Sequence, residues 1–218
     1  MHPREPPQSR YRMPDPRAAL PNGLLACGGD LEPGTVLAAY RAGIFPWPDP
    51  DERLLWWSPD PRAILPLDRF HESRSLRRTR RRGTFRVTFD RAYRSVMEGC
   101  ADRPEGTWIT SSILAAYVAL HELGWAHSVE VWAGERLVGG AYGVAIGGFF
   151  AAESMFHREP NASKVALAEL VEHLRGVGAR LLDVQLLTTH LASLGAAAVA
   201  RDEYLRLLRE AIALESRF

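Results

Sequence analysis

The segment from residue 126 to 156 limits the folds open to this chain more than any other. It reads A-H-S-V-E-V-W-A-G-E-R-L-V-G-G-A-Y-G-V-A-I-G-G-F-F-A-A-E-S-M-F and holds three β-rich runs. Short turns at Ala133-Gly134 and Gly147-Gly148 separate these runs. The pattern predicts a meander of antiparallel hairpins.

Helices and further strands flank the meander. Amphipathic patterns predict helices over 90–100, 111–123, 162–177 and 202–214, and strands over 63–67, 85–89 and 181–185. A helix over 31–41, with Asp30 as its N-cap and Gly43 as its stop, precedes a proline-rich aromatic segment that excludes regular helix. This order of elements is the ground plan of an acetyl-CoA-dependent N-acetyltransferase type of fold. We expect an α+β protein, with a small N-terminal domain (1–62) and an acetyltransferase-like (GNAT-type) α/β domain with a mixed sheet (63–218).

Composition narrows the cellular context. With 218 residues, 46% hydrophobic and 24% charged, the chain has the make-up of an ordinary soluble protein. No apolar run approaches the roughly 20 residues of a membrane span, and the first ten residues lack the apolar core of a signal peptide. Cys27 and Cys100 have no metal or redox spacing. We therefore expect a cytoplasmic protein with free thiols and no membrane partner.

Arginine is concentrated in one short block. Net charge is only +1, yet eight arginines lie between Arg69 and Arg86, with Asp68 and Glu72 as the nearby acids. Such a block is suited to binding phosphates. The alternative is a solvated surface loop, and the single lysine, Lys164, shows that arginine is favoured throughout. The candidate nucleic-acid ligands are Arg74, Arg77, Arg78, Arg80, Arg81 and Arg82.

An acid and an amide interrupt the apolar strand L-L-D-V-Q. Asp183 and Gln185 are two residues apart, which on a strand means the same face. Burying an unpaired carboxylate costs several kcal/mol. The pair is therefore either part of a hydrogen-bond network that holds the strand or exposed to a cavity where a reaction takes place.

Coenzyme A is not an expected ligand. Members of the fold that use it bind its pyrophosphate at a helix N-terminus after a glycine-rich turn, where free backbone N–H groups favour phosphate. The corresponding connection here, F-H-R-E-P-N-A-S-K-V-A-L, has no glycine pair. We expect no cofactor, and the acyl donor must come by another route.

Nearly the whole chain, from about Pro21 to Arg201, resembles the leucyl/phenylalanyl-tRNA–protein transferases. The matching stretches include P-N-G-L-L-A-C-G-G-D-L, A-Y-R-A-G-I-F-P-W, L-W-W-S-P-D-P-R, H-E-L-G-W-A-H-S-V-E-V-W, E-S-M-F, N-A-S-K and L-L-D-V-Q. The resemblance implies transfer of Leu, Phe or Met from aminoacyl-tRNA to proteins that begin with Arg or Lys. The products are substrates of N-end-rule degradation.

The same resemblance implies roles for the strand pair. The reaction is aminolysis of an ester that is already activated, so neither ATP nor metal is required. Gln185 would orient the reacting groups, while Asp183 would either hold that amide or accept the proton. A hydrogen-bonded pair that only fixes the strand is the structural alternative.

The donor pocket is expected around Glu153, Ser154, Met155 and Phe156, with Trp47 and Trp108 as its walls. An aromatic wall can also stack on the terminal adenine, at roughly 1–3 kcal/mol per base. By resemblance, Glu153 contacts the donor amino group; the alternatives are the acceptor's basic side chain or a salt bridge with Lys164 or Arg158. Plain core packing is the alternative for each tryptophan.

Two residues depart from the family pattern. Ala152 stands where the family usually has glycine, which crowds the pocket by a methyl group and can alter donor preference. Val184 stands where the family usually has cysteine, between Asp183 and Gln185. Its side chain is expected on the opposite face, which argues against a cysteine nucleophile.

The histidines are scattered without the spacing of metal ligands, so we expect no metal. His127 and His190 lie beside strand ends, and structural roles are favoured for both. Three rival functions stay open: a transferase of the same fold acting on cell-wall precursors, a non-catalytic tRNA-binding module, and a family member with a changed acceptor. The cell-wall enzymes usually carry two such domains, for which this chain is short.

Overall fold

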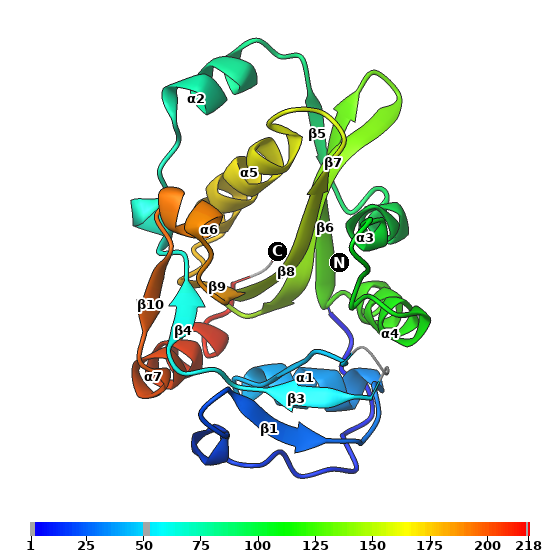
Figure 1. Ribbon diagram of the computed structural model, residues 1–218, viewed down its shortest axis with the longest axis vertical. Coiled ribbons are helices and arrows are strands. Elements are labelled where there is room, and N and C mark those ends of the chain that lie inside the picture. The colour runs from blue at the N-terminus through cyan, green and yellow to red at the C-terminus, as the bar shows by residue number, and fades with distance from the viewer. Residues whose placement is uncertain (1–2, 50–52, 217) are drawn as a thin grey trace.

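Two β-sheets of different size organise the molecule (Figure 1). The computed structural model describes residues 3–49, 53–216 and 218. The strands are β1 Leu24–Cys27, β2 Phe45–Pro46, β3 Leu55–Trp57, β4 Arg62–Ile64, β5 Arg86–Phe89, β6 Ala126–Ala133, β7 Arg136–Ile146, β8 Phe149–His157, β9 Leu181–Gln185 and β10 Ala197–Val199. The α-helices are α1 Pro33–Arg41, α2 Arg74–Arg81, α3 Tyr93–Ala101, α4 Ser111–Glu122, α5 Ala162–Gly176, α6 Thr189–Ser193 and α7 Arg201–Ile212. Short 3₁₀ turns occupy Pro16–Ala18 and Leu67–Arg69.

The larger sheet has the strand order β10-β4-β9-β8-β7-β6-β5. The predicted meander forms β6, β7 and β8, which pair antiparallel through the two predicted turns. β8 and β9 are joined by α5 and pair in parallel. The sheet is therefore mixed, which confirms the predicted α+β class and order of elements.

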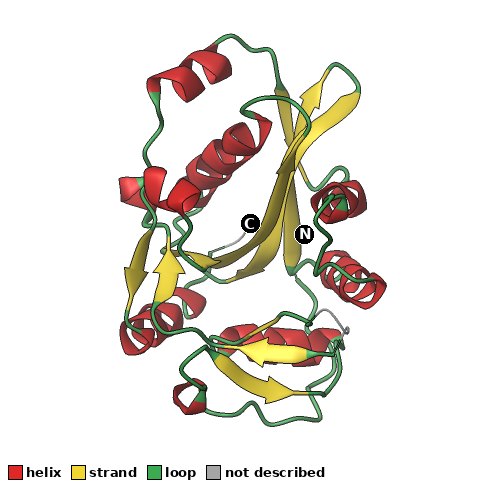
Figure 2. Cartoon of the chain, in the orientation of Figure 1, coloured by secondary structure: helices red, strands yellow, loops and turns green. Residues whose placement is uncertain are grey.

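Helices cover both faces of this sheet (Figure 2). α5 packs against β6, β7 and β8 on one face, and α3 packs against the same strands on the other, beside α4. The apolar side chains divide accordingly into two buried cores, one under α5 and one shared by α1, α3, α4 and α7. Within the described ranges, no helix is both long and apolar enough to cross a membrane.

The smaller sheet, β1-β3-β2, lies beside α1 at one end of the molecule (Figure 1). Trp56 of β3 is buried, and its indole donates a hydrogen bond to the carbonyl of Gly28 (2.8 Å). The extended segment that begins at residue 3 is attached to the end of α4, because Arg4 N–H donates to Leu123 O (2.8 Å). The small unit is thus fastened to the helices that flank the large sheet.

Several local predictions need correction. The first helix begins at Pro33 with Glu32 as its N-cap, and the Asp30 carboxylate instead accepts from the Glu32 backbone N–H (3.2 Å). The arginine block is not a loop but helix α2, capped by Ser73, whose hydroxyl accepts from Leu76 N–H (3.2 Å). The short strands β1, β2, β3 and β10 and helix α6 were not predicted. The proline-rich segment contains β2 and β3 but no helix among its described residues.

The close approach of β7 and β8 depends on glycine at position 143. A Cβ there would run into the backbone oxygen of Ala151 and the ring of Phe150. We expect Gly143→Ala to lower the free energy of unfolding by about 1–3 kcal/mol, because two paired strands must shift. Gly176→Ala, where a Cβ meets nothing within 4 Å, should be neutral or stabilising by up to about 1 kcal/mol. Chemical denaturation measures the free energy of unfolding of both variants. Equal values for Gly143→Ala and Gly176→Ala would contradict the packing argument.

Candidate active site

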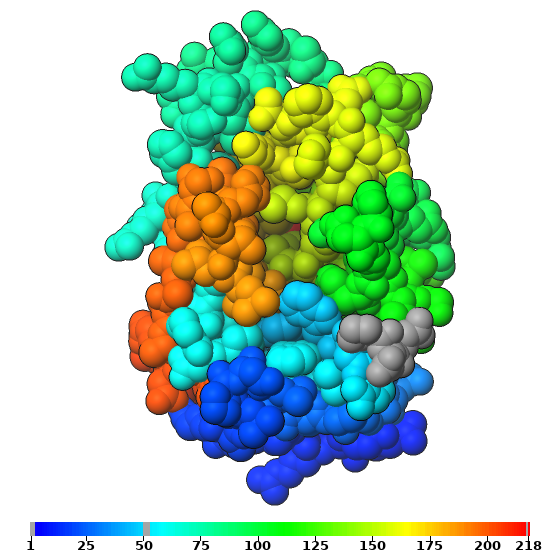
Figure 3. All heavy atoms as spheres, in the orientation of Figure 1, coloured from blue at the N-terminus to red at the C-terminus, as the bar shows by residue number. Residues whose placement is uncertain are grey.

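The candidate site lies where two neighbouring strands separate. β8 and β9 pair only from Phe149 to Ala151 and from Leu181 to Asp183. Figure 3 shows a hollow on this face, with the olive atoms of β8 at its floor. The orange segment after β9, the green segment before α4 and the light-blue end of the small unit surround it. Glu153 and Gln185 follow the last paired residues of the two strands, and their side chains meet where the strands separate.

A buried ion pair lies at the base of the site. The Asp183 carboxylate is fully buried and accepts two hydrogen bonds from Arg62, from Nε to Oδ1 (2.9 Å) and from Nη2 to Oδ2 (2.6 Å). The Tyr204 hydroxyl also donates to Oδ2 (2.9 Å). Arg62 lies between the rings of Phe45 and Tyr204, at 4.6 and 4.5 Å from their centroids. Burial acts to lower the pKa of Arg62, but the Asp183 carboxylate raises it above its ordinary value.

The backbone turns sharply at Gln185. Its φ is +54°, a left-handed conformation that is uncommon for a residue other than glycine. The Asp183 Oδ1 atom accepts a hydrogen bond from Gln185 N–H (2.9 Å), which supports this conformation. The Gln185 side-chain amide then donates to Glu153 Oε1 (3.0 Å). The buried ion pair therefore positions an amide that reaches across from β9 to β8.

A β-bulge directs Glu153 towards this amide. Tyr142 on β7 lies opposite Ser154, and Gly143 lies opposite Ala152, so Glu153 is the extra residue of β8. Bulges of this kind change the direction of a side chain and are common next to active sites. The sequence pattern showed no sign of this irregularity.

Two buried tyrosines complete the surroundings of Glu153. Tyr117 of α4 donates to Glu153 Oε2 (3.4 Å), and its hydroxyl lies 2.5 Å from that of Tyr40 of α1. Burial raises the pKa of Glu153 to about 8; Tyr40 opposes this rise and the Asp183 charge adds to it. Burial, with the nearby Glu153, also raises the pKa values of both tyrosines. Glu153 therefore changes charge near neutral pH.

The two predicted aromatic walls are in contact. The rings of Trp47 and Trp108 have centroids 5.8 Å apart and are inclined by 40°. Trp47 is 38% exposed and, with Leu186, lines a hollow of about 630 Å³ beside the small sheet. Trp47 is exposed at this surface, whereas Trp108 is partly buried and packs against the main core, so core packing stays an alternative for Trp108.

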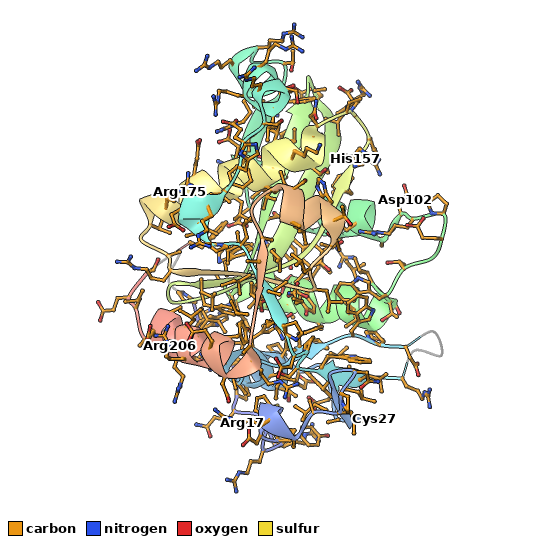
Figure 4. The ribbon with its side chains drawn as sticks, turned by 60° about the vertical axis from the view of Figure 1, so that its left-hand side comes forward. Arg17, Cys27, Asp102, His157, Arg175 and Arg206 are labelled. Carbon is orange, nitrogen blue, oxygen red and sulfur yellow. The ribbon has the colours of Figure 1, made fainter. Side chains whose placement is uncertain are left out.

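The remaining predicted pocket residues divide between two environments. Ser154 accepts a hydrogen bond from Arg103 Nη2 (3.0 Å). Phe156 is buried against Gly99 of α3, while with Met155 it lines a separate hollow of about 240 Å³. In Figure 4, Asp102 and His157, which also line this second hollow, lie on the same side of the molecule.

Helix α2 presents a one-sided row of arginines. Arg74, Arg77, Arg78 and Arg81 are exposed, and their spacing places them on one helical face. Arg80 differs, because it forms ion pairs with Glu72, Glu169 and Glu172 at 3.0, 2.9 and 2.7 Å. These contacts attach α2 to α5, so Arg80 is a structural residue and not an open phosphate ligand.

Comparison with known proteins identifies the family of this chain. The sequence profile described as "Leucyl/phenylalanyl-tRNA protein transferase" matches residues 64–209, and the profile of its N-terminal domain matches 29–60. The chain belongs to the leucyl/phenylalanyl-tRNA protein transferase family. That membership makes it an aminoacyltransferase.

Relatives match over most of their length. A leucyl/phenylalanyl-tRNA–protein transferase of Klebsiella pneumoniae subsp. pneumoniae is 56% identical over 198 residues, which are 89% of this chain and 85% of that protein. One of Escherichia coli O7:K1 is 54% identical over 200 residues, or 90% and 86%. Among solved structures, a GCN5-related N-acetyltransferase from Kribbella flavida has a TM-score of 0.43 at 12% identity, covering 77% of this chain and 61% of that one.

The structure of the transferase brings some predicted residues together and adds others. Asp183, Gln185 and Glu153 form one hydrogen-bonded chain. The expected alternative of a Glu153–Arg158 salt bridge is wrong, because Arg158 pairs with Asp102 (3.6 Å). Sequence reasoning missed four residues of the site: Arg62, Tyr40, Tyr117 and Tyr204. The buried acid on β9 was a signal that a cation must lie nearby, but it did not reveal which one.

Histidines and cysteines lie outside this arrangement. His127 pairs with Asp90 (2.8 Å) and stacks on Phe218, so its role is structural. Cys100 is buried, while Cys27 lies at the surface of the small unit (Figure 4). Among the described residues, no three metal-ligating side chains are grouped as a candidate metal site.

The raised pKa of Glu153 predicts a pH-dependent stability. The group's ordinary pKa is 4.5 and its folded value is about 8, so the native protein retains this proton where the unfolded chain loses it. The resulting stabilisation is complete below about pH 4.5 and is lost as the pH rises through 8. We expect Glu153→Gln to gain stability relative to the unmodified protein between pH 6 and 8.5. Thermal unfolding of both proteins at several pH values measures this difference. A difference in unfolding temperature that does not change with pH would contradict the prediction.

Proposed function

We propose that the transferase moves Leu, Phe or Met from aminoacyl-tRNA to the α-amine of proteins that begin with Arg or Lys. The Glu153–Gln185 contact at the separation of β8 and β9 carries this proposal, in a chain that belongs to the transferase family. We further propose that transfer occurs in the cytoplasm and that the products enter N-end-rule degradation.

The reaction suits the groups that line the site. The ester of aminoacyl-tRNA is already activated, so the protein must place the amine on the carbonyl carbon, orient it and remove a proton. Gln185 is fixed by its turned backbone and by Glu153, which supports its role in orientation. Asp183 acts on Gln185 through the backbone hydrogen bond and is thus a positioning residue.

Apolar and aromatic surface supports the binding of an apolar donor. We assign Trp47 and Trp108 as walls that contact the donor side chain or the terminal adenine, and we keep Met155 and Phe156, which line a separate hollow, as candidate substrate contacts. Glu153 and Ser154, the other candidate substrate contacts, precede Met155 on β8. A hydrophobic pocket distinguishes side chains by about 1–3 kcal/mol per methylene, which accords with a small set of accepted donors.

The exposed face of α2 supports a sequence-independent contact with tRNA phosphates. Arg74, Arg77, Arg78 and Arg81 lie in one row, and Arg82 follows at the helix end. An enzyme that accepts several tRNAs must recognise backbone and the attached amino acid more than base edges. We assign no coenzyme A and no metal to the reaction, because neither is required for aminolysis of this ester.

The acceptor rule is tested by transfer of labelled Phe from Phe-tRNA, without ATP or coenzyme A. Peptides that differ only in their first residue, Arg, Lys, Asp or Ala, serve as acceptors. We expect label on the Arg and Lys peptides only, and similar transfer from Leu-tRNA and Met-tRNA. Products are separated by chromatography and identified by mass.

Other results would replace the proposal with a specific alternative. Label on the Asp peptide would establish a changed acceptor. No label on any peptide, with tRNA still bound, would favour a tRNA-binding module and return Asp183 and Gln185 to a purely structural role.

The α2 row predicts salt-dependent tRNA binding. Replacing Arg74, Arg78 and Arg81 by Gln should weaken binding and make the plot of log affinity against log salt shallower by about two, because up to three phosphate contacts are lost. The control variant replaces Arg12, Arg17 and Arg206, which are also exposed. Arg17 and Arg206 lie at the end of the molecule away from α2. Equal salt slopes for both triple variants would disprove the phosphate-binding role of α2.

A further inference from the structure

Asp183 has no room left for a proton from the substrate. Its Oδ1 atom accepts from Arg62 Nε and Gln185 N–H, both at 2.9 Å. Its Oδ2 atom accepts from Arg62 Nη2 (2.6 Å) and the Tyr204 hydroxyl (2.9 Å). A carboxylate has about four lone-pair sites, and all are in use. The carboxylate is also fully buried, so an incoming amine cannot reach it.

Glu153 differs from Asp183 in both respects. As a residue it is partly exposed, and it follows the part of β8 that pairs with β9. Its Oε1 atom accepts from the Gln185 amide (3.0 Å), and its Oε2 atom accepts from Tyr117 through a long contact of 3.4 Å. The Tyr40 hydroxyl also hydrogen-bonds this carboxyl, so three of its four acceptor sites are in use and one is retained. No basic side chain of the described residues forms an ion pair with it within 4.0 Å.

The orientation of Gln185 follows from the same contact. Its Nε2 atom donates to Glu153, so its Oε1 atom is left to accept a hydrogen bond. An amine that donates one N–H to this oxygen lies next to the Glu153 carboxylate, because the two side chains are in direct contact. The amine then has an orienting group and a proton acceptor side by side.

We propose that Glu153, and not Asp183, takes the proton that the acceptor's α-amine loses as the peptide bond forms. This inference rests on the proposed function and assigns the proton acceptor within it. The family resemblance places this glutamate only against the donor's amino group, which is a binding role.

The step balances without any further reactant. The neutral amine adds to the ester carbonyl and forms the new C–N bond. One N–H proton passes to the Glu153 carboxylate. The bond between the carbonyl carbon and the ribose oxygen then breaks, and that oxygen takes the proton from the Glu153 carboxyl. The products are the extended protein and tRNA with a free ribose hydroxyl, and Glu153 returns to its starting charge.

The surroundings of Glu153 adapt it to this role. A general base is most effective when its pKa is close to the working pH. Burial raises the pKa of Glu153 to about 8. The titratable and charged groups around it are Tyr40 on α1, Tyr93 on α3, Tyr117 on α4, Tyr142 on β7, Asp183 on β9, Arg62 on β4 and Tyr204 on α7.

The test measures single-turnover transfer from Phe-tRNA, with enzyme in excess and an Arg peptide at saturation. Glu153→Gln preserves the shape of the side chain and an oxygen that accepts from Gln185, but it cannot take a proton. We expect its rate to fall about 10²- to 10⁴-fold, with the peptide KM and Phe-tRNA affinity changed by less than about threefold. A rate within threefold of the unmodified enzyme, or a loss confined to KM or tRNA affinity, would overturn the proposal.

Tyr117→Phe separates the titration of Glu153 from that of the peptide amine. The Tyr117 hydroxyl lowers the pKa of Glu153, so its loss raises that pKa. We expect the rise of the single-turnover rate with pH to move to higher pH in this variant. The peptide amine titrates identically in both proteins, so an unmoved profile would overturn the proposal. Absence of transfer by the unmodified enzyme would instead disprove the proposed function itself.

Discussion

The buried ion pair of Arg62 and Asp183 is the interaction on which the site depends. It joins β4 to β9, and Arg62 also donates to the carbonyl of Gly43 (3.3 Å) after α1. Removing one partner of such a pair costs about 3–5 kcal/mol, because the other charge stays buried and unpaired. The pair therefore fixes the end of β9, and through the Gln185 backbone it fixes the amide that enters the hollow.

Two carboxylates within one network have different chemical properties because their surroundings differ. Asp183 lies against the Arg62 guanidinium, whereas Glu153 lies against the hydroxyls of Tyr40 and Tyr117. A pair of acids separated in this way can divide the work of positioning and proton transfer. Gln185 hydrogen-bonds both carboxylates, so the position of Asp183 also affects the surroundings of Glu153.

Sequence reasoning succeeded where the signal is local. The meander, α5 and β9 follow from periodicity and glycine turns, and Asp183 and Gln185 stand out as polar residues in an apolar strand. It failed on α2, since Leu76 is the one apolar residue in that helix and leaves no periodic pattern. It also missed Arg62, which lies 121 residues from its partner, and the bulge at Glu153, which depends on strand pairing.

The contact between Tyr40 and Tyr117 has a consequence for the evolution of the chain. Tyr40 comes from the helix beside the small sheet, yet it helps to set the acidity of a group on β8. If Glu153 takes the proton as proposed, the N-terminal unit contributes to the chemistry through Tyr40. Exchange of this unit between distant homologues would alter the optimum pH of the hybrid enzyme unless both tyrosines were inherited together. Under that proposal, selection acts on Tyr40 and Tyr117 together.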